Sequence, residues 1–141
     1  MKAKYNEMNV VFENIDVYYH EAAKRMGLSD AEFILLYILV QADDFIPQKR
    51  IYQETCKSKS TINSAIKKLE NNGIVELKAL DGKSTLVRLT KEGKKLSQNT
   101  VVKVIEIENR IYDSWSNEQK EMALYLNKDF LDKFSAEVER L

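Results

Sequence analysis

Asn63 and Lys67 lie one helical turn apart in a segment whose polar side chains are suited to contact nucleic acid. Its apolar side chains recur at i, i+3, i+4 and i+7, the spacing of a helix with one face packed on a core, at Ile62, Ala65, Ile66 and Leu69. The opposite face carries short hydroxyl and amide groups and lysines, and it has no carboxylate before Glu70. Asparagine can pair with adenine, and lysine can contact guanine or phosphate. A solvated amphipathic helix with no ligand would show the same periodicity. The segments on either side of this helix must therefore distinguish that reading from nucleic-acid binding.

A short β-hairpin is predicted directly after this helix. Gly73 is free to take the left-handed conformation that ends many helices. Residues 74–80 and 86–90 are strand-like runs joined through an Asp-Gly turn, which is typical of a hairpin. Upstream, residues 47–57 supply a preceding helix with Pro47 at its first position, where the missing N–H has no cost. A helix pair followed by a hairpin is the winged helix-turn-helix arrangement.

Residues 28–96 resemble the DNA-binding core of the MarR family of transcriptional regulators. The matching pieces are Leu28-Ser-Asp-Ala-Glu-Phe33, Lys59-Ser-Thr-Ile-Asn63, Lys68-Leu-Glu-Asn-Asn-Gly-Ile-Val75 and Leu89-Thr-Lys-Glu-Gly-Lys-Lys-Leu96. The chain departs from the family in two places. The family wing usually carries an arginine that enters the minor groove, whereas this wing offers Lys83. The turn of the family motif tends to hold an apolar residue and a glycine, where this chain has Lys57 and Cys56.

The resemblance implies a dimeric, sequence-specific transcriptional regulator, a repressor that reads a palindromic operator. We expect the helix at 59–71 to enter a major groove and the wing at 81–85 to reach the flanking backbone or minor groove. The residues expected to contact DNA are Ser58, Ser60, Thr61, Asn63, Ser64, Lys67, Lys68, Lys83, Ser84, Thr85 and Arg88. The alternative is a winged-helix module that binds protein without base-specific DNA binding.

Basic residues are concentrated on the segment that resembles a DNA reader, although 22 basic and 22 acidic residues cancel over the whole chain. Residues 48–95 hold 12 Lys and Arg against 5 Asp and Glu, a net charge of +7, whereas residues 1–47 carry −4 and residues 96–141 carry −3. Such a distribution is the electrostatic footprint of a protein that binds a polyanion. It favours double-stranded DNA as the partner.

The predicted fold is mainly α with a small β-hairpin, in three parts: an N-terminal dimerisation helix (1–27), a winged helix-turn-helix DNA-binding lobe (28–95) and C-terminal dimerisation helices (96–141). Residues 91–115 are expected to form one long helix. The first segment has an apolar helical seam, Met8, Phe12, Ile15, Tyr19, Ala22 and Met26. The last segment has a seven-residue register, Leu124, Leu131, Phe134, Val138 and Leu141. A homodimer would cover the apolar side chains of both segments. An intramolecular bundle of the same helices is the alternative.

No catalytic, metal or cofactor site is expected, and the chain is not predicted to be an enzyme. His20 is the only histidine, no nucleophile motif lies near it, and we expect it to be partly buried or interfacial. Asp43 and Asp44 have no histidine or cysteine cluster beside them. The longest apolar run, residues 33–40, is far shorter than the ~20 residues that cross a bilayer. These features, and the lack of an opening signal peptide, predict a cytoplasmic protein without a membrane span.

Cys56, the single cysteine, lies in the turn of the helix-turn-helix. Lys57 and Lys59 nearby would favour a reactive thiolate and hence redox sensing. Cysteine also serves as a small packing hydrophobe, and this is the reading we favour.

Members of the MarR family often bind small aromatic acids in a crevice between the dimer helices and the DNA-binding lobe. By this resemblance, the aromatic residues that would line the crevice are Tyr18, Tyr19, Phe33 and Tyr37. Aromatic residues at these spacings more often belong to a core, so a small aromatic effector is suggested by the resemblance alone.

Overall fold

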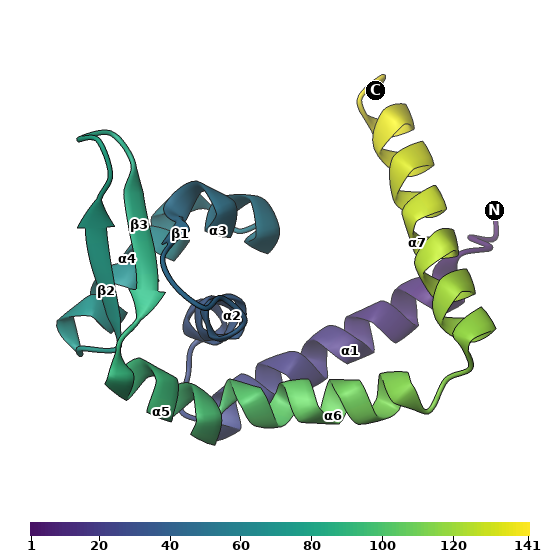
Figure 1. Ribbon diagram of the computed structural model, residues 1–141. Helices are drawn as coiled ribbons and strands as arrows, with labels where there is room; N and C mark the ends of the chain where they lie inside the picture. The colour runs from purple at the N-terminus through teal and green to yellow at the C-terminus, as the bar shows by residue number, and fades with distance from the viewer. The chain divides into compact units, whose positions relative to one another are not determined.

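The helix expected to read DNA forms over Lys59–Asn71 and is α4 of the computed structural model (Figure 1). The structure describes all 141 residues. In chain order the elements are α1 (Asn6–Arg25), α2 (Asp30–Val40), β1 (Ile46–Pro47), α3 (Gln48–Thr55), α4 (Lys59–Asn71), β2 (Val75–Ala79), β3 (Thr85–Leu89), α5 (Lys91–Asn99), α6 (Val101–Asp113) and α7 (Asn117–Val138). They confirm the mainly α winged helix-turn-helix fold. The chain divides into two units, residues 1–104 and 105–141.

The core of the first unit lies where α2 and α4 pack together and against the sheet. All four residues of the predicted α4 stripe are buried, and Ile62 has no exposed surface. Leu35 and Leu36 of α2, Ile51 of α3 and Val87 of β3 are equally inaccessible. Burial of each such side chain contributes about 1.5–3 kcal/mol. This shared core fixes α3, α4 and the hairpin relative to one another.

The hairpin predicted after α4 is confirmed, but it belongs to a three-stranded sheet of order β1-β3-β2. β2 and β3 are antiparallel, with Val75 opposite Leu89. β1 pairs with β3, with Ile46 opposite Val87, and this strand was not predicted. Two residues are too short to show a strand alternation in sequence.

Two predictions about α3, the first helix of the helix-turn-helix motif, were wrong. Pro47 is the N-cap of α3 rather than its first helical residue, with φ −63° and ψ 136°. Its fixed φ and missing N–H suit an extended strand end as well as a helix start, and pairing with β3 selects the extended form. The helix runs only from Gln48 to Thr55.

The long helix expected over residues 91–115 is interrupted at Thr100, which separates α5 from α6. Thr100 has φ −127° and ψ −97°, outside helical geometry. Its hydroxyl donates to the carbonyl of Leu96 at 2.7 Å, a back-bond that competes with regular helix geometry. The next residue, Val101, is completely buried and begins α6.

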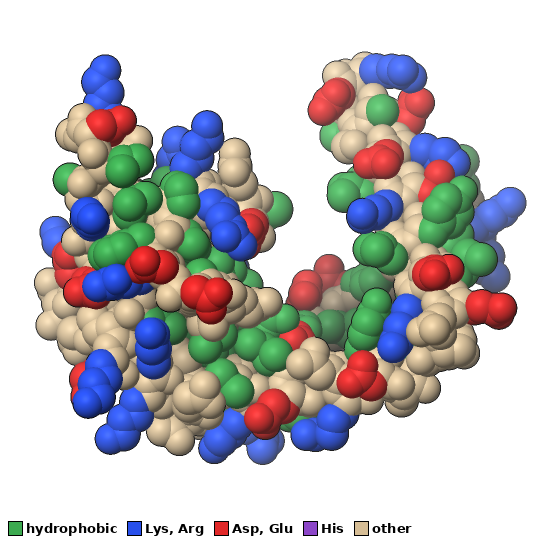
Figure 2. All heavy atoms as spheres, in the orientation of Figure 1, with side chains coloured by type: hydrophobic (Ala, Val, Ile, Leu, Met, Phe, Trp, Pro, Cys, Tyr) green, Lys and Arg blue, Asp and Glu red, His purple; other side chains and the backbone are tan.

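The second unit holds the end of α6 and all of α7, and α7 buries none of its 22 residues. Its start is fixed by Ser116 and Gln119, whose side chains each bond the other's backbone N–H. Hydrophobic side chains gather along α7 in Figure 2. In the first unit, α1 also leaves apolar side chains exposed, including Met8 and Ile15 of the predicted seam. None of the helices is both long and apolar enough to span a membrane.

Candidate nucleic-acid interface

The amino end of α4 is capped by Ser58, whose hydroxyl accepts a hydrogen bond from the backbone N–H of Thr61 at 3.2 Å. The same oxygen lies 2.7 Å from the Thr61 hydroxyl. The first turn of α4 contains no acidic side chain. The positive end of the helix dipole is therefore not neutralised by a carboxylate of its own first turn, which favours an approaching phosphate.

The outward face of α4 gathers the hydrogen-bonding side chains that the sequence placed there. Ser60, Thr61, Asn63, Ser64 and Lys67 are all exposed. They lie opposite the buried stripe because a helix repeats its faces every three to four residues. The arrangement presents several short donors and acceptors and one long cation on one exposed face of the helix.

Asn63 is already engaged by the preceding helix. Its carbonyl oxygen accepts a hydrogen bond from the amide of Gln48 at 3.2 Å and another from the hydroxyl of Tyr52. The sequence pattern predicted that Asn63 is exposed and contacts bases. It did not indicate these two partners, which lie 15 and 11 residues away in the chain. The amide nitrogen is thus the hydrogen-bonding group of Asn63 left to face a ligand.

Lys68 is part of an ion pair at the edge of this face. Its ammonium lies 2.9 Å from a carboxylate oxygen of Glu32, a residue of α2 whose side chain is only 8% exposed. Burial raises the pKa of the Glu32 carboxyl, but hydrogen bonds from Lys68 and Ser29 outweigh burial and hold that pKa below its ordinary value. The ammonium of Lys68, which the sequence assigned to DNA, is therefore paired with a carboxylate within the protein.

The tip of the wing is shaped by Asp81. Its carboxylate accepts hydrogen bonds from the backbone N–H groups of Lys83 at 3.2 Å and Ser84 at 3.0 Å, which hold the pKa of the Asp81 carboxyl below its ordinary value. Gly82 supplies the left-handed turn at φ +79°. Lys83 and Ser84 are exposed, while Thr85 is half-buried. A basic side chain extends from the end of the hairpin in Figure 2.

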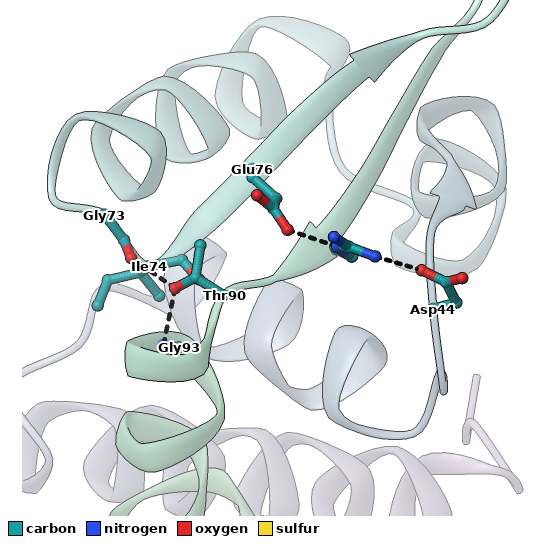
Figure 3. A network of polar contacts seen from close by, with 7 residues as sticks. Asp44, Gly73, Ile74, Glu76, Thr90 and Gly93 are labelled. Carbon is teal, nitrogen blue, oxygen red and sulfur yellow. Dashed lines mark hydrogen bonds and ion pairs between the residues drawn. The ribbon is translucent and has the colours of Figure 1, made fainter.

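Arg88 lies within the sheet rather than at the wing tip. Its guanidinium bonds Glu76 at 2.5 Å and Asp44 at 2.8 Å (Figure 3). It also lies 4.2 Å from the centre of the Phe45 ring. These hydrogen bonds to Glu76 and Asp44 raise the pKa of Arg88 further above its already high value. The contacts tie the hairpin to the loop before β1.

A second network in Figure 3 sets the distance between α4 and the wing. The hydroxyl of Thr90 lies 2.5 Å from the carbonyl oxygen of Gly73 and 3.1 Å from that of Ile74, and it accepts the N–H of Gly93 at 3.1 Å. One side chain thus joins the turn after α4 to the start of α5. These hydrogen bonds hold the base of the hairpin against the turn after α4.

Comparisons with known proteins show the family and the fold of the chain. A comparison with models of protein families finds no match. Among curated proteins, an uncharacterized HTH-type transcriptional regulator of Bacillus subtilis (strain 168), YwoH, is 30% identical over 115 residues, which cover 81% of this chain and 83% of YwoH. The chain belongs to the HTH-type transcriptional regulators.

Solved structures show that this HTH-type regulator has the MarR fold. NMB1585, a MarR family regulator from Neisseria meningitidis, matches with a TM-score of 0.79 and 18% identity, over 99% of this chain and 98% of NMB1585. MepR from S. aureus in complex with DNA matches with a TM-score of 0.72 and 15% identity, over 95% of this chain and 99% of MepR. The resemblance drawn from the sequence motifs is confirmed.

Cys56 of the regulator is exposed, so the expectation that it packs as a small hydrophobe was wrong. It follows α3 with φ +53° and is the only residue other than glycine with a positive φ. A sharp turn must connect α3 to α4 there, and the turn holds the side chain in solvent. His20 is also exposed in the single chain, and its Nδ1 lies 2.9 Å from Asp30. The partly buried position was therefore wrong, and the interfacial position stays a prediction.

The four aromatic residues suggested for an effector crevice divide into a cluster and an outlier. Tyr19 and Tyr37 both contact Phe33, with ring centres 6.3 and 6.2 Å apart. Phe33 is 6% exposed and belongs to the core, whereas Tyr18 is 73% exposed.

No group of three or more His, Cys, Asp or Glu side chains in the regulator is placed to hold a metal ion.

Proposed function

We propose that this HTH-type regulator is a homodimeric repressor that reads a palindromic operator with α4 and the β2–β3 wing. The observation that carries the proposal is the outward face of α4, where exposed hydroxyl, amide and lysine side chains gather beside a wing that carries the exposed Lys83. The MarR fold is shared with MepR, whose structure is known in complex with DNA. Side chains of this kind on a helix suit base edges and phosphates in the major groove.

The contacts divide between the helix and the wing. On α4, Asn63 and Lys67 would meet base edges, with hydroxyl groups on either side contacting bases or phosphates. In the wing, Lys83 would reach the flanking phosphates or the minor groove. Lys68 and Arg88 are already bound to carboxylates, so their part is to position the surface and to contact phosphate at its edge. The remaining contacts are assigned to Ser58, Ser60, Thr61, Ser64, Ser84 and Thr85.

A second copy of the chain would cover the apolar surface that the single chain leaves exposed. We assign residues 1–27 and 96–141 to dimerisation and residues 28–95 to DNA binding. The support is the surface left exposed: no residue of α7 is buried, and Leu131 and Phe134 are 62% and 57% exposed. An isolated helix is marginally stable in water, so α7 needs a partner that covers its apolar side chains. A two-fold dimer presents its two α4 helices to symmetric half-sites, which is why the operator is expected to be palindromic.

Three further assignments accompany this function. The aromatic cluster of Tyr19, Phe33 and Tyr37 would accept a small aromatic effector, and Tyr18, the fourth residue assigned to the crevice, lies outside this cluster. The protein would act in the cytoplasm, where chromosomal DNA is accessible in bacteria. Its role would be binding rather than catalysis.

Selection of bound duplexes from a random pool tests the proposal directly. A palindrome with half-sites about one helical turn apart is the expected result. Binding without sequence preference would indicate an architectural DNA-binding protein. Absence of binding to any duplex at low salt would favour the protein-interaction module. A reporter gene placed behind the selected sequence should then be expressed less when the protein is present.

A further inference from the structure

The carbonyl oxygen of Asn63 is held by two donors from α3, and this limits what Asn63 can recognise. Gln48 donates through its amide nitrogen at 3.2 Å, and Tyr52 donates through its hydroxyl. A carbonyl oxygen has two lone pairs, so two donors fill its capacity. The amide nitrogen of Asn63 keeps its two N–H donors.

We propose that Asn63 reads a guanine, as a pure hydrogen-bond donor, and that Tyr52 and Gln48 are the positioning residues that impose this choice. The inference rests on the proposed function, because it names the base that α4 selects at one operator position. Asparagine usually pairs with adenine by accepting from N6 and donating to N7, which needs both ends of its amide. Here the accepting end is already used inside the protein.

Guanine fits the remaining donors better than the other bases. In the major groove it presents two acceptors, O6 and N7, whereas adenine and cytosine present an amino group that would face the Asn63 amide nitrogen. Thymine offers a single acceptor beside its methyl group. An Asn63 side chain restricted to donation therefore favours guanine and disfavours adenine.

The two positioning residues are themselves held in place. Both come from α3, whose neighbouring residue Ile51 is completely buried in the core. The ammonium of Lys59 lies 5.6 Å from the centre of the Tyr52 ring, which gives Tyr52 a second contact with the start of α4. A fixed Tyr52 hydroxyl holds the Asn63 amide in one orientation before DNA arrives, so little side-chain entropy remains to be lost on binding.

The experiment compares base preference, which loss of packing alone would not shift from one base to another. Duplex selection is performed with the wild type and with Asn63→Ala, and the position whose preference disappears in the variant is the one that Asn63 reads. We expect guanine there in the wild type. Replacing that guanine with 7-deazaguanine, which lacks the N7 acceptor, should weaken wild-type binding by about five- to tenfold and leave Asn63→Ala unaffected.

Tyr52→Phe removes only the hydroxyl and keeps the ring over which Lys59 lies. It should admit adenine at this position while binding to random duplex stays unchanged, because the Asn63 carbonyl regains an acceptor site. Gln53→Ala is the matched control, since Gln53 is an exposed residue of the same helix. It should select the wild-type sequence. If Tyr52→Phe fails to fold, the 7-deazaguanine comparison on the wild type decides.

Two other results would overturn the inference in different ways. Adenine or cytosine at the Asn63 position of the wild type, unchanged by Tyr52→Phe, would show that the carbonyl is available to DNA. The proposed regulator function would survive that result. A wild type that selects no sequence at all would remove the proposed function and this inference together.

Discussion

Gly93 lies directly against the carbonyl group of Ile74. A Cβ at position 93 would overlap the carbonyl oxygen and lie 3.0 Å from its carbon. The same carbonyl accepts the backbone N–H of Thr90 at 3.0 Å, so it cannot turn away without breaking that bond. The close approach of α5 to the base of the wing thus depends on the absence of a side chain.

Gly93→Ala is expected to destabilise the protein by about 3 kcal/mol or more, because the backbone at Ile74 must move to admit the methyl group. Urea unfolding followed by circular dichroism measures the change. Lys94→Ala is the control: Lys94 is exposed on the same helix, and its replacement should stay within about 0.5 kcal/mol of the wild type. Equal stability of the two variants would mean that α5 does not approach Ile74 so closely.

Cys56→Gly is expected to stabilise the protein by about 0.5–1 kcal/mol. Cys56 has φ +53°, a conformation that glycine adopts without the steric cost borne by other residues. Cys56→Ala keeps that cost and should leave stability close to the wild type. Thermal or urea unfolding of both variants checks the order. A Cys56→Gly protein less stable than Cys56→Ala would contradict the left-handed turn.

Glu32 should make the stability of the fold depend on pH under acidic conditions. Its folded-state pKa lies below the ordinary value of 4.5, so its contribution is fully present above pH 4.5 and is lost as the pH falls through the lower folded pKa. Glu32→Gln should flatten the pH dependence of the free energy of unfolding in this acidic window. Urea titrations in buffers on either side of pH 4.5 measure it. Glu70→Gln, at an exposed position on α4, is the matched control.

Asn63→Ala and Lys83→Ala should separate specificity from affinity. Loss of the Asn63 amide should cost about 1–3 kcal/mol on the selected operator and little on random duplex, because only the operator offers the matching base. Lys83→Ala should weaken both duplexes by similar factors and reduce the log–log salt slope by roughly one unit, since its ammonium meets phosphate. Titrations of each variant against both duplexes at several salt concentrations show the difference. Equal weakening of both duplexes by Asn63→Ala would rule out base reading by this residue.

The protein should sediment as a dimer at micromolar concentration. Deleting residues 1–26 removes the apolar seam of α1 and should leave an aggregated or unfolded chain, because apolar surface that this seam covers in the dimer becomes exposed. Analytical ultracentrifugation of both proteins tests this. Well-behaved monomers in both cases would contradict the assignment of the terminal segments to dimerisation.

The parts of the protein that sequence alone determined are those encoded by local spacing. The buried stripe of α4 follows from helical periodicity, and each of its four members is buried. The left-handed turns at Gly73 and Gly82 follow from residue type, as does the hairpin between strand-like runs. The amino acids that decide such features lie within a few residues of one another, so their order in the chain is sufficient.

Only the tertiary structure decided which side chains on these elements are engaged with one another. Lys68 meets Glu32 across 36 residues, Arg88 meets Asp44 across 44, and the Asn63 carbonyl is held from α3. Each contact depends on how far one element is shifted and rotated against another. That register is set by the shared core rather than by any local pattern. The sequence predicted a row of available polar groups on this surface. In the folded protein, some of these donors and acceptors already bond other side chains before DNA binds.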